Sequence, residues 1–355
     1  MVKKIVIVAL LLLSAFAIIN RERIMGFFGE DTRSINKSEV KLLFREDPSL
    51  DTLVEVLIEK GVIASDEDFR KYIEENTIDT SNFAAGKYLI LSQTQLEDLV
   101  TGFLKNEEGN GNAEVKVNVV FNRCKTIEDI GANISQCILA DSTAIVDFIK
   151  SPETLKKYGF SIQQMPAMFL PKTYELYFDT DAEAFVEFMA AEFKAFWTEE
   201  RLQKMSNVGL RSQSQVTTVA SIVFAEQAKM EEEWPIIARL YLNRVNKGMR
   251  LESDPTFKFC WGDELDGVER LLNKHKAIDC PYNTYLYDGL PPGPICIPPA
   301  EVIDAVLNPA DVNYLFMCGK PGGQGHNFAV TNAGHEKNVA VYRKWLKKYL
   351  EDKEN

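Results

Sequence analysis

Histidine is scarce in this chain of 355 residues: only His275, His326 and His335 occur, and no two stand in an H-x-x-x-H arrangement. No C-x-x-C is present either, and these spacings are the usual signatures of zinc sites. A metal-dependent hydrolase is therefore disfavoured, and we expect neither a metal nor another cofactor. A serine hydrolase is disfavoured too, because no G-x-S-x-G occurs, and Gly319–Gly323 lacks the order of a phosphate-binding loop.

Positive charge is also in short supply. The chain has 40 Lys and Arg against 52 Asp and Glu, a formal net charge of −12, and shows no basic patch. Because nucleic-acid affinity comes mainly from cations that neutralise phosphates, we expect no nucleic-acid partner. The hydrophobic fraction of 46% and charged fraction of 26% are ordinary for a globular protein with two domains or three small ones.

The longest apolar run lies at the N-terminus. Ile5–Ile19 is fifteen residues long, contains one polar residue, Ser14, and follows the basic pair Lys3-Lys4. A cleaved signal peptide, with Ala15–Ala17 at the cleavage site, and a membrane anchor, for which this length is short, both fit the pattern. In either case the lysines favour a cytoplasmic N-terminus, so everything after residue 20 is expected to be exported.

Six cysteines suit an exported chain, but six allow 15 pairings and the sequence does not select among them. We expect mainly small buried apolar side chains with at most one or two bridges. The cysteines are Cys124, Cys137, Cys260, Cys280, Cys296 and Cys318.

The patterning along the chain predicts an α+β fold. After a polar stretch over 20–38, apolar runs at 40–44 and 87–91 are typical of strands, and helical spacing follows at 50–58, 66–73 and 96–104. This predicts a strand–helix–helix–strand unit, which ends at the turn-forming segment 106–112.

The remainder begins with an alternating strand over 115–121 and a helix over 127–139 that Thr126 caps. We expect two helices within 141–158, separated at Ser151-Pro152, and an aromatic loop over 169–177. Further helices are predicted over 182–196, 217–230 and 236–245.

One carboxylate stands out in the 217–230 helix. Glu226 continues the apolar face formed by Val219, Ile222 and Val223, where an ionised carboxylate is unfavourable unless it is paired. One interpretation is a buried ion pair with a nearby arginine, for which Arg239, Arg244 and Arg250 are available. The other is a carboxyl whose pKa is raised by an apolar pocket, so that it donates a proton near neutral pH.

Loops rich in Tyr, Asn, Pro and Gly follow this helix and suit a rigid groove for a sugar polymer. Together with Glu226 they resemble the YceG-like family of endolytic murein transglycosylases in order and spacing. The matching segments are A-S-I-V-x-x-E at 220–226, L-N-R-V at 242–245, G-M-R-L-x-S-D-P-T at 248–256, P-Y-N-T-Y at 281–285, G-L-P-P-G-P-I at 289–295 and H-N-F at 326–328.

The resemblance implies an anchor at 1–20 in the inner membrane, a stalk over 21–38, a small LysM-like βααβ module over 39–106 and a larger mixed α+β catalytic domain over 113–350. It implies a periplasmic enzyme that cuts the β-1,4 bond between N-acetylmuramic acid and N-acetylglucosamine in nascent peptidoglycan strands. The cut leaves a 1,6-anhydro end and ends strand growth, and peptidoglycan synthases are expected partners.

The family's catalytic glutamate falls on Glu226. Two positions depart from the family pattern: Phe224 stands where another Glu is frequent, and Lys172 stands where Asp is usual. Six further residues are candidate substrate contacts: Tyr282, Asn283, Tyr285, Asn327, Arg244 and Asp254. For Arg244 and Asp254 we favour a bracing role. The alternative function is a non-catalytic, membrane-tethered scaffold that binds peptidoglycan through the 39–106 module.

Overall fold

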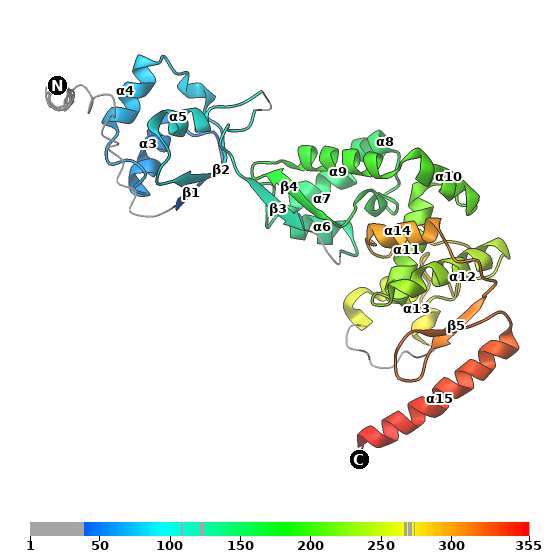
Figure 1. Ribbon diagram of the computed structural model, residues 1–355. Helices are drawn as coiled ribbons and strands as arrows, with labels where there is room; N and C mark the ends of the chain where they lie inside the picture. Colours follow the sequence, from blue (N-terminus) through cyan, green and yellow to red (C-terminus); the bar gives the residue numbers. More distant parts are fainter. Residues whose placement is uncertain are drawn as a thin grey trace, which may run out of the picture. The chain divides into compact units, whose positions relative to one another are not determined.

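The computed structural model describes residues 39–107, 109–120, 124–265, 268, 272 and 274–354. Its fold is mixed α+β, as predicted, with helices predominating and two-stranded sheets between them (Figure 1). The predicted anchor and stalk, residues 1–38, lie outside the described residues. Within the described part of the chain, no helix is both long and apolar enough to cross a membrane.

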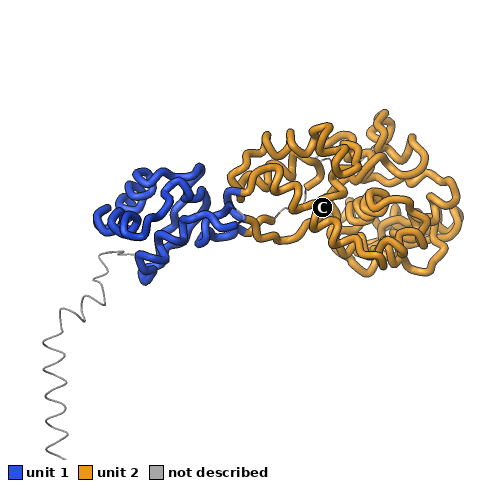
Figure 2. The backbone as a smooth tube through the Cα atoms, turned by 90° about the horizontal axis from the view of Figure 1, so that it is seen from above, with its two compact units in different colours: residues 1–117, 177–179 blue, residues 118–176, 180–355 orange. Residues whose placement is uncertain are grey.

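Two compact units make up the chain (Figure 2). The first comprises Met1–Val117 together with Tyr177–Asp179, and the second comprises Asn118–Leu176 together with Thr180–Asn355.

The first unit contains the predicted strand–helix–helix–strand order. Strands β1 and β2 pair antiparallel, with Glu39 opposite Leu91 and Phe44 opposite Gly86, and every second residue of β1 is buried. The buried side chains form one apolar core with the helices, so the alternation in the sequence decides which face of the sheet is covered. The similarity of this unit to a LysM module stays a prediction. The elements are β1 (Glu39–Phe44), α3 (Leu50–Glu59), α4 (Glu67–Glu75), η1 (Thr80–Asn82), β2 (Gly86–Leu91) and α5 (Leu96–Phe103).

The next part of the chain is built on helices whose starts were visible in the sequence. Thr126 and Asp129 form a capping box at the start of α6, and the predicted separation at Ser151-Pro152 is confirmed. The elements are β3 (Lys116–Val120), α6 (Ile127–Ile134), α7 (Ser142–Lys150), α8 (Pro152–Tyr158), η2 (Met165–Met168), β4 (Thr173–Tyr177) and α9 (Ala182–Phe196).

The aromatic loop expected over 169–177 is wrong in its second half. Residues 173–177 form strand β4, which pairs with β3. Tyr174 and Leu176 are buried while Thr173 and Glu175 are exposed, and this alternation in T-Y-E-L-Y is the strand signal that the aromatic content obscured.

The rest of the second unit surrounds α11, which is buried along most of its length and packs against α12, α13 and α14 (Figure 1). A helix that is buried along most of its length has little polar face, so its apolar periodicity is weak. The elements are α10 (Glu199–Asn207), α11 (Gln213–Glu226), η3 (Glu231–Glu233), α12 (Trp234–Asn246), α13 (Asp254–Trp261), η4 (Gly262–Leu265), η5 (His275–Ala277), α14 (Ala300–Leu307), β5 (Phe316–Gly319), β6 (His326–Ala329) and α15 (Asn332–Glu354).

The bounds predicted for the Glu226 helix are wrong at both ends. The helix begins earlier, because the Ser212 hydroxyl caps it by accepting the Gln215 N–H at 3.2 Å. It ends at Glu226, because Gln227 adopts an extended backbone with φ −143° and ψ 91°. The carboxylate therefore lies at the C-terminal end of a buried helix.

Candidate active site

Glu226 accepts two short hydrogen bonds on the same carboxylate oxygen. The Tyr241 hydroxyl, from α12, donates to Oε1 at 2.7 Å, and the Ser253 hydroxyl donates to Oε1 at 2.6 Å. Within the described residues Oε2 has no hydrogen-bond partner. Oε1 is thus held in place, while Oε2 remains available to contact a substrate.

The surroundings keep the Glu226 carboxyl protonated to a higher pH than usual. Burial raises its pKa, and the negative charge of Asp254 acts in the same direction. The hydrogen bonds from Ser253 and Tyr241 and the charge of His326 lower the pKa, but the net shift is upward. This is the electrostatic setting of a group that donates a proton.

The buried ion pair considered as the alternative is not formed by any of the three arginines. Arg239 donates to the carbonyl of Ala310, and Arg250 pairs with Asp288 at 2.8 Å. Arg244 is 6% exposed and pairs with Glu252. Arg244 and Arg250 therefore pair with acidic residues other than Glu226.

Arg244 braces the loop that carries Ser253. Its guanidinium donates to the carbonyls of Arg250 and Leu315 at 2.7 and 2.9 Å, besides pairing with Glu252. Glu252 has φ +52°, a left-handed conformation that is uncommon for a residue other than glycine and tends to occur at functional sites. These contacts support the bracing role predicted for Arg244.

Asp254, Tyr285 and Lys276 form a second group beside Glu226. The Lys276 ammonium lies 2.8 Å from Asp254 Oδ1 and donates to the Tyr285 hydroxyl at 2.7 Å. That hydroxyl also lies 2.5 Å from Asp254 Oδ1. Two predicted residues are thus brought together by a lysine that the motif comparison had not singled out.

A buried carboxylate positions His326. Glu233 is 4% exposed. Its Oε1 accepts the His326 backbone N–H at 2.8 Å, and its Oε2 lies 2.7 Å from Nδ1 of the His326 ring. Burial raises the pKa of Glu233, but the hydrogen bonds and the charge of His326 outweigh this and hold the pKa below its usual range. A Cβ at Gly325 would come within 2.3 Å of Glu233 Oε1, so only glycine permits this approach.

These groups line a cavity of about 440 Å³. It is strongly polar and contains the side chains of both acids and bases. The lining includes Glu226, Tyr241, Arg244, Glu252, Asp254, Lys276, Tyr285, Cys318, His326 and His335.

Three predicted contacts are absent from this lining. Asn283 is fully buried, and its amide donates to the carbonyls of Lys276 and Ile278 at 2.9 and 2.8 Å. Tyr282 packs against Phe259, with ring centroids 4.7 Å apart. Asn327 alternates with His326 along β6, so the two side chains project to opposite faces of the strand. For Asn283 these bonds favour a bracing role over substrate contact.

The sequence motifs contained part of the signal for the residues that were missed. Ser253 stands next to Asp254 in S-D-P-T, and His326 stands next to Asn327 in H-N-F. Tyr241 precedes Arg244 by three positions on the same helix, so the two lie on one face. Glu233 and Lys276 had no local signal, because their partners are distant in sequence.

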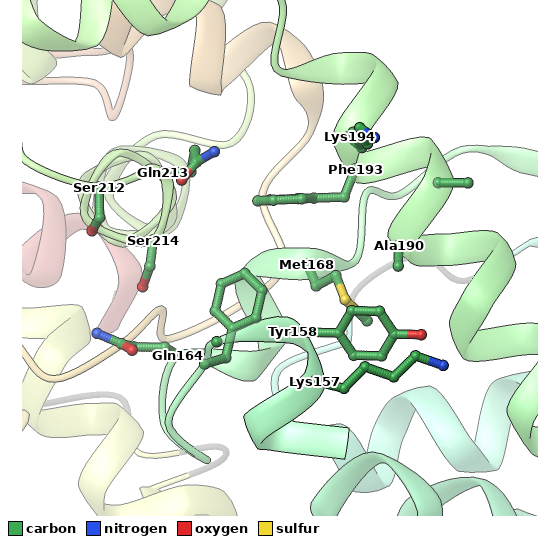
Figure 3. Close-up of a pocket in the computed structure, with 13 residues that line it drawn as sticks. Lys157, Tyr158, Gln164, Met168, Ala190, Phe193, Lys194, Ser212, Gln213 and Ser214 are labelled. Carbon is green, nitrogen blue, oxygen red and sulfur yellow. The ribbon is translucent and has the colours of Figure 1, made fainter. Parts of the chain in front are cut away.

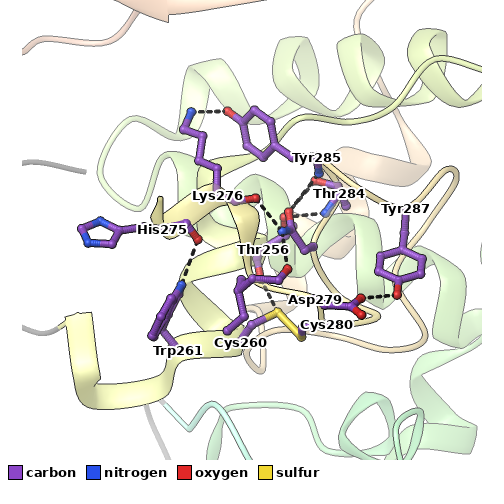
Figure 4. Close-up of a disulfide and its surroundings, with 12 residues drawn as sticks. Thr256, Cys260, Trp261, His275, Lys276, Asp279, Cys280, Thr284, Tyr285 and Tyr287 are labelled. Atoms are coloured by element: carbon purple, nitrogen blue, oxygen red, sulfur yellow. Dashed lines mark hydrogen bonds between the residues drawn. A yellow bond between two sulfur atoms is a disulfide. The ribbon is translucent and has the colours of Figure 1, made fainter. Parts of the chain in front are cut away.

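A disulfide ties two parts of the site together. Cys260, at the end of α13, is bonded to Cys280, with Cα atoms 6.2 Å apart and a sequence separation of 20 (Figure 4). The bridged segment carries Lys276 and leads directly into Tyr282–Tyr285. The other four cysteines form no disulfide, in line with the expectation of few bridges.

The model of the YceG-like family matches residues 44–341. The chain belongs to the YceG-like family. An endolytic murein transglycosylase of Bacillus subtilis is 26% identical over 311 residues, which are 83% of this chain and 82% of that protein. The endolytic murein transglycosylase of Streptococcus pneumoniae D39 is 23% identical over 287 residues, which are 74% of this chain and about half (51%) of that protein.

The crystal structure of a yceG-like protein from Listeria monocytogenes has a similar fold. It has a TM-score of 0.53 and 23% identity, and the match covers 85% of this chain and 99% of that one. In this YceG-like chain, Phe224 packs on Trp234 with ring centroids 6.4 Å apart. The position where the family often has a second Glu is therefore apolar here.

The effects that raise and lower the pKa of Glu226 can be measured separately with two substitutions. Ser253→Ala removes a donor to the carboxylate and should raise the pKa of Glu226. Asp254→Asn removes a nearby negative charge and should lower that pKa. A carbon-13 NMR titration of the labelled Glu226 carboxyl measures both, and shifts in the same direction would contradict this account of the site.

Removing the disulfide should destabilise the protein and loosen the Lys276 segment. For a separation of 20 residues the loop-entropy estimate is about 3 kcal/mol. Urea unfolding of the double variant Cys260→Ser/Cys280→Ser should show a loss of this order, while Cys137→Ser, at a free cysteine, should change little. Equal stabilities of the double variant and the parent protein would show that the bridge is dispensable.

Proposed function

We propose that this chain is an endolytic lytic transglycosylase of peptidoglycan. It cleaves the β-1,4 bond between N-acetylmuramic acid and N-acetylglucosamine in nascent strands, leaves a 1,6-anhydro end and thereby ends strand elongation. The observation that carries the proposal is Glu226, a carboxyl with a raised pKa that is held by Tyr241 and Ser253 in a polar cavity. The names of the Bacillus and Streptococcus relatives support the same reaction class.

The arrangement favours a lyase over a hydrolase because, among the described carboxyl groups that line the cavity, Glu226 alone has no cationic partner. Glycoside hydrolases generally use two carboxyl groups, one of them as a nucleophile or as a base that activates water. Here Glu252 is paired with Arg244 and Asp254 with Lys276, so both other carboxylates in the cavity are already engaged. Glu226 therefore has to act both as acid and as base.

The reaction then needs no water. Glu226 protonates the glycosidic oxygen as the bond from C1 of the muramic acid to that oxygen breaks, and the substrate's N-acetyl group stabilises the positive charge that develops at C1. The ionised Glu226 next takes the proton of the C6 hydroxyl as that oxygen bonds to C1. The anhydro ring closes, and Glu226 regains its proton for the next cycle.

His326 stabilises the ionised form of Glu226 between the two steps. Its charge lowers the pKa of Glu226, and Glu233 holds the imidazole in position. Tyr285, Asp254 and Arg244 shape the cavity around the sugar. Tyr282, Asn283 and Asn327 remain proposed contributors, through the loops they hold rather than through the cavity lining.

The location and partners of the enzyme follow from the family assignment as proposals. The segment 1–20 would anchor the chain in the inner membrane, with its N-terminus in the cytoplasm and its catalytic part in the periplasm. That position places the enzyme beside peptidoglycan synthases, which supply new glycan strands.

Glu226→Gln should abolish cleavage while preserving the cavity, because the amide keeps the shape and an acceptor oxygen but cannot donate the required proton. Mass spectrometry of products from a defined glycan strand should show anhydro ends with the parent protein and none with the variant. Products ending in a reducing sugar would identify a hydrolase instead. Binding to sacculi without any cleavage by the parent protein would support the scaffold function.

His326→Ala should lower kcat by about tenfold, which corresponds to about 1.4 kcal/mol of lost transition-state stabilisation. It should also move the alkaline limb of the pH–rate profile upward, since loss of the histidine's positive charge raises the pKa of Glu226. Glu233→Gln should weaken the support of His326 and give a smaller change of the same sign. A lower rate with an unmoved alkaline limb would show that His326 does not act through Glu226.

A further inference from the structure

Two adjoining cavities lie at the other end of α11, away from Glu226. The first has a volume of about 510 Å³ and the second about 500 Å³, and both are lined by Gln164 and Ser214. Figure 3 shows the first cavity, with the Ser212–Ser214 turn on one side and Phe193, Met168 and Tyr158 on the other. Neither cavity has been given a role in the reaction proposed above.

The charge around these cavities is opposite to that of the chain as a whole. Among the described residues that line them there is no carboxylate, although the chain carries a net charge of −12. Three cationic side chains are present: Lys157 and Lys194 at the first cavity and Arg211 at the second. Lys157 is paired with Glu187 at 2.6 Å, whereas Lys194 has no ion pair in the described part of the chain.

The start of α11 adds free hydrogen-bond donors. The Ser212 cap satisfies the N–H of Gln215 through its hydroxyl and that of Val216 through its carbonyl. The N–H groups of Gln213 and Ser214 have no acceptor among the described residues, as is usual for a first helical turn. A helix of 14 residues also carries partial positive charge at this end, which favours an anion.

Ser214 gives an independent indication of a ligand. It is only 5% exposed, yet its hydroxyl has no hydrogen-bond partner within the described residues, and it lines both cavities. The hydroxyl oxygen itself is not sealed from solvent, so it is open to a ligand in the cavities. In Figure 3 this hydroxyl lies on the side of the turn nearest Gln164, the other shared residue.

The opposite wall of the first cavity is apolar. Phe160 and Phe193 pack edge to face, with ring centroids 5.7 Å apart, and Met168 lines the same cavity. A free inorganic anion has no apolar surface that could pack against this wall. A peptide with small apolar side chains and a carboxylate would contact both walls.

We propose that the start of α11 binds a carboxylate of a peptide, with Ser214 and the N–H groups of Gln213 and Ser214 as donors and Lys194 as the cation. This rests on the proposed function, under which the peptide is the stem attached to the glycan strand. At about 1.5 Å per residue, 14 residues place this site about 20 Å from Glu226. Contact there would increase the affinity for the strand without touching the bond that is cut.

The test compares two substrates on the full-length protein: strands with free peptide carboxylates and strands whose peptide carboxylates have been amidated. Lys194→Glu should raise KM for the free-carboxylate strands about three- to tenfold, the range expected for one charge-assisted contact, and leave kcat unchanged. KM for the amidated strands should stay the same. Lys156→Glu, a matched exposed change outside both cavities, should affect neither substrate.

Ser214→Asp is a second variant, because an acidic residue suits the first turn of a helix but would repel a bound carboxylate. Isothermal titration of soluble stem peptide into each full-length protein measures the site separately from cleavage. Binding to the parent protein that is lost in both variants supports the proposal. Equal binding in all proteins, or an equal KM change for both kinds of strand, would overturn it. Absence of anhydro products with any strand would defeat the proposed function, and the titration would still decide the peptide site.

Discussion

The site depends on keeping the carboxyl of Glu226 largely out of water at the end of a buried helix. Desolvation of a carboxyl raises its pKa, and hydrogen bonds to its ionised form oppose that rise. Tyr241 and Ser253 donate to a single oxygen, so they fix the position of the group while the net shift in pKa remains upward. The helices around α11 and the loop after Arg250 can therefore be understood as the support of one neutral acid.

The other charges of the cavity are arranged so that none of them neutralises Glu226 directly. Arg244 is occupied by Glu252, Lys276 by Asp254 and His326 by Glu233. A cation in direct contact with Glu226 would stabilise the carboxylate and remove the proton that the chemistry needs. His326 affects Glu226 through its charge and without a hydrogen bond to it, so it offsets only part of the rise in pKa that desolvation causes. This pairing lets a strongly polar cavity contain an acid with a raised pKa.

Sequence patterns predicted the elements whose signals are local. The cap at Thr126, the separation at Ser151-Pro152 and the helix over 182–196 follow from capping and helical spacing, and the structure confirms them. The bounds of α11 could not be predicted in this way, because a helix buried along most of its length has little polar face to mark its ends. Glu233 and Lys276 were missed because a contact across 93 residues, such as that of Glu233 with His326, leaves no local pattern.

Helix α11 serves the site through both of its ends. The aligned peptide dipoles leave partial negative charge at its C-terminal end, which disfavours ionisation of Glu226 in addition to burial. The same dipoles leave partial positive charge at Gln213 and Ser214, where the cavities lack carboxylates. One buried helix thus favours a neutral acid at one end and an anion at the other. Because its side chains pack tightly against α12 and α14, the distance between the two ends is fixed. Under the proposed function, the enzyme cuts inside a strand and has to hold the polymer on at least one side of the cleaved bond. A rigid helix with these two ends would provide both functions in one element.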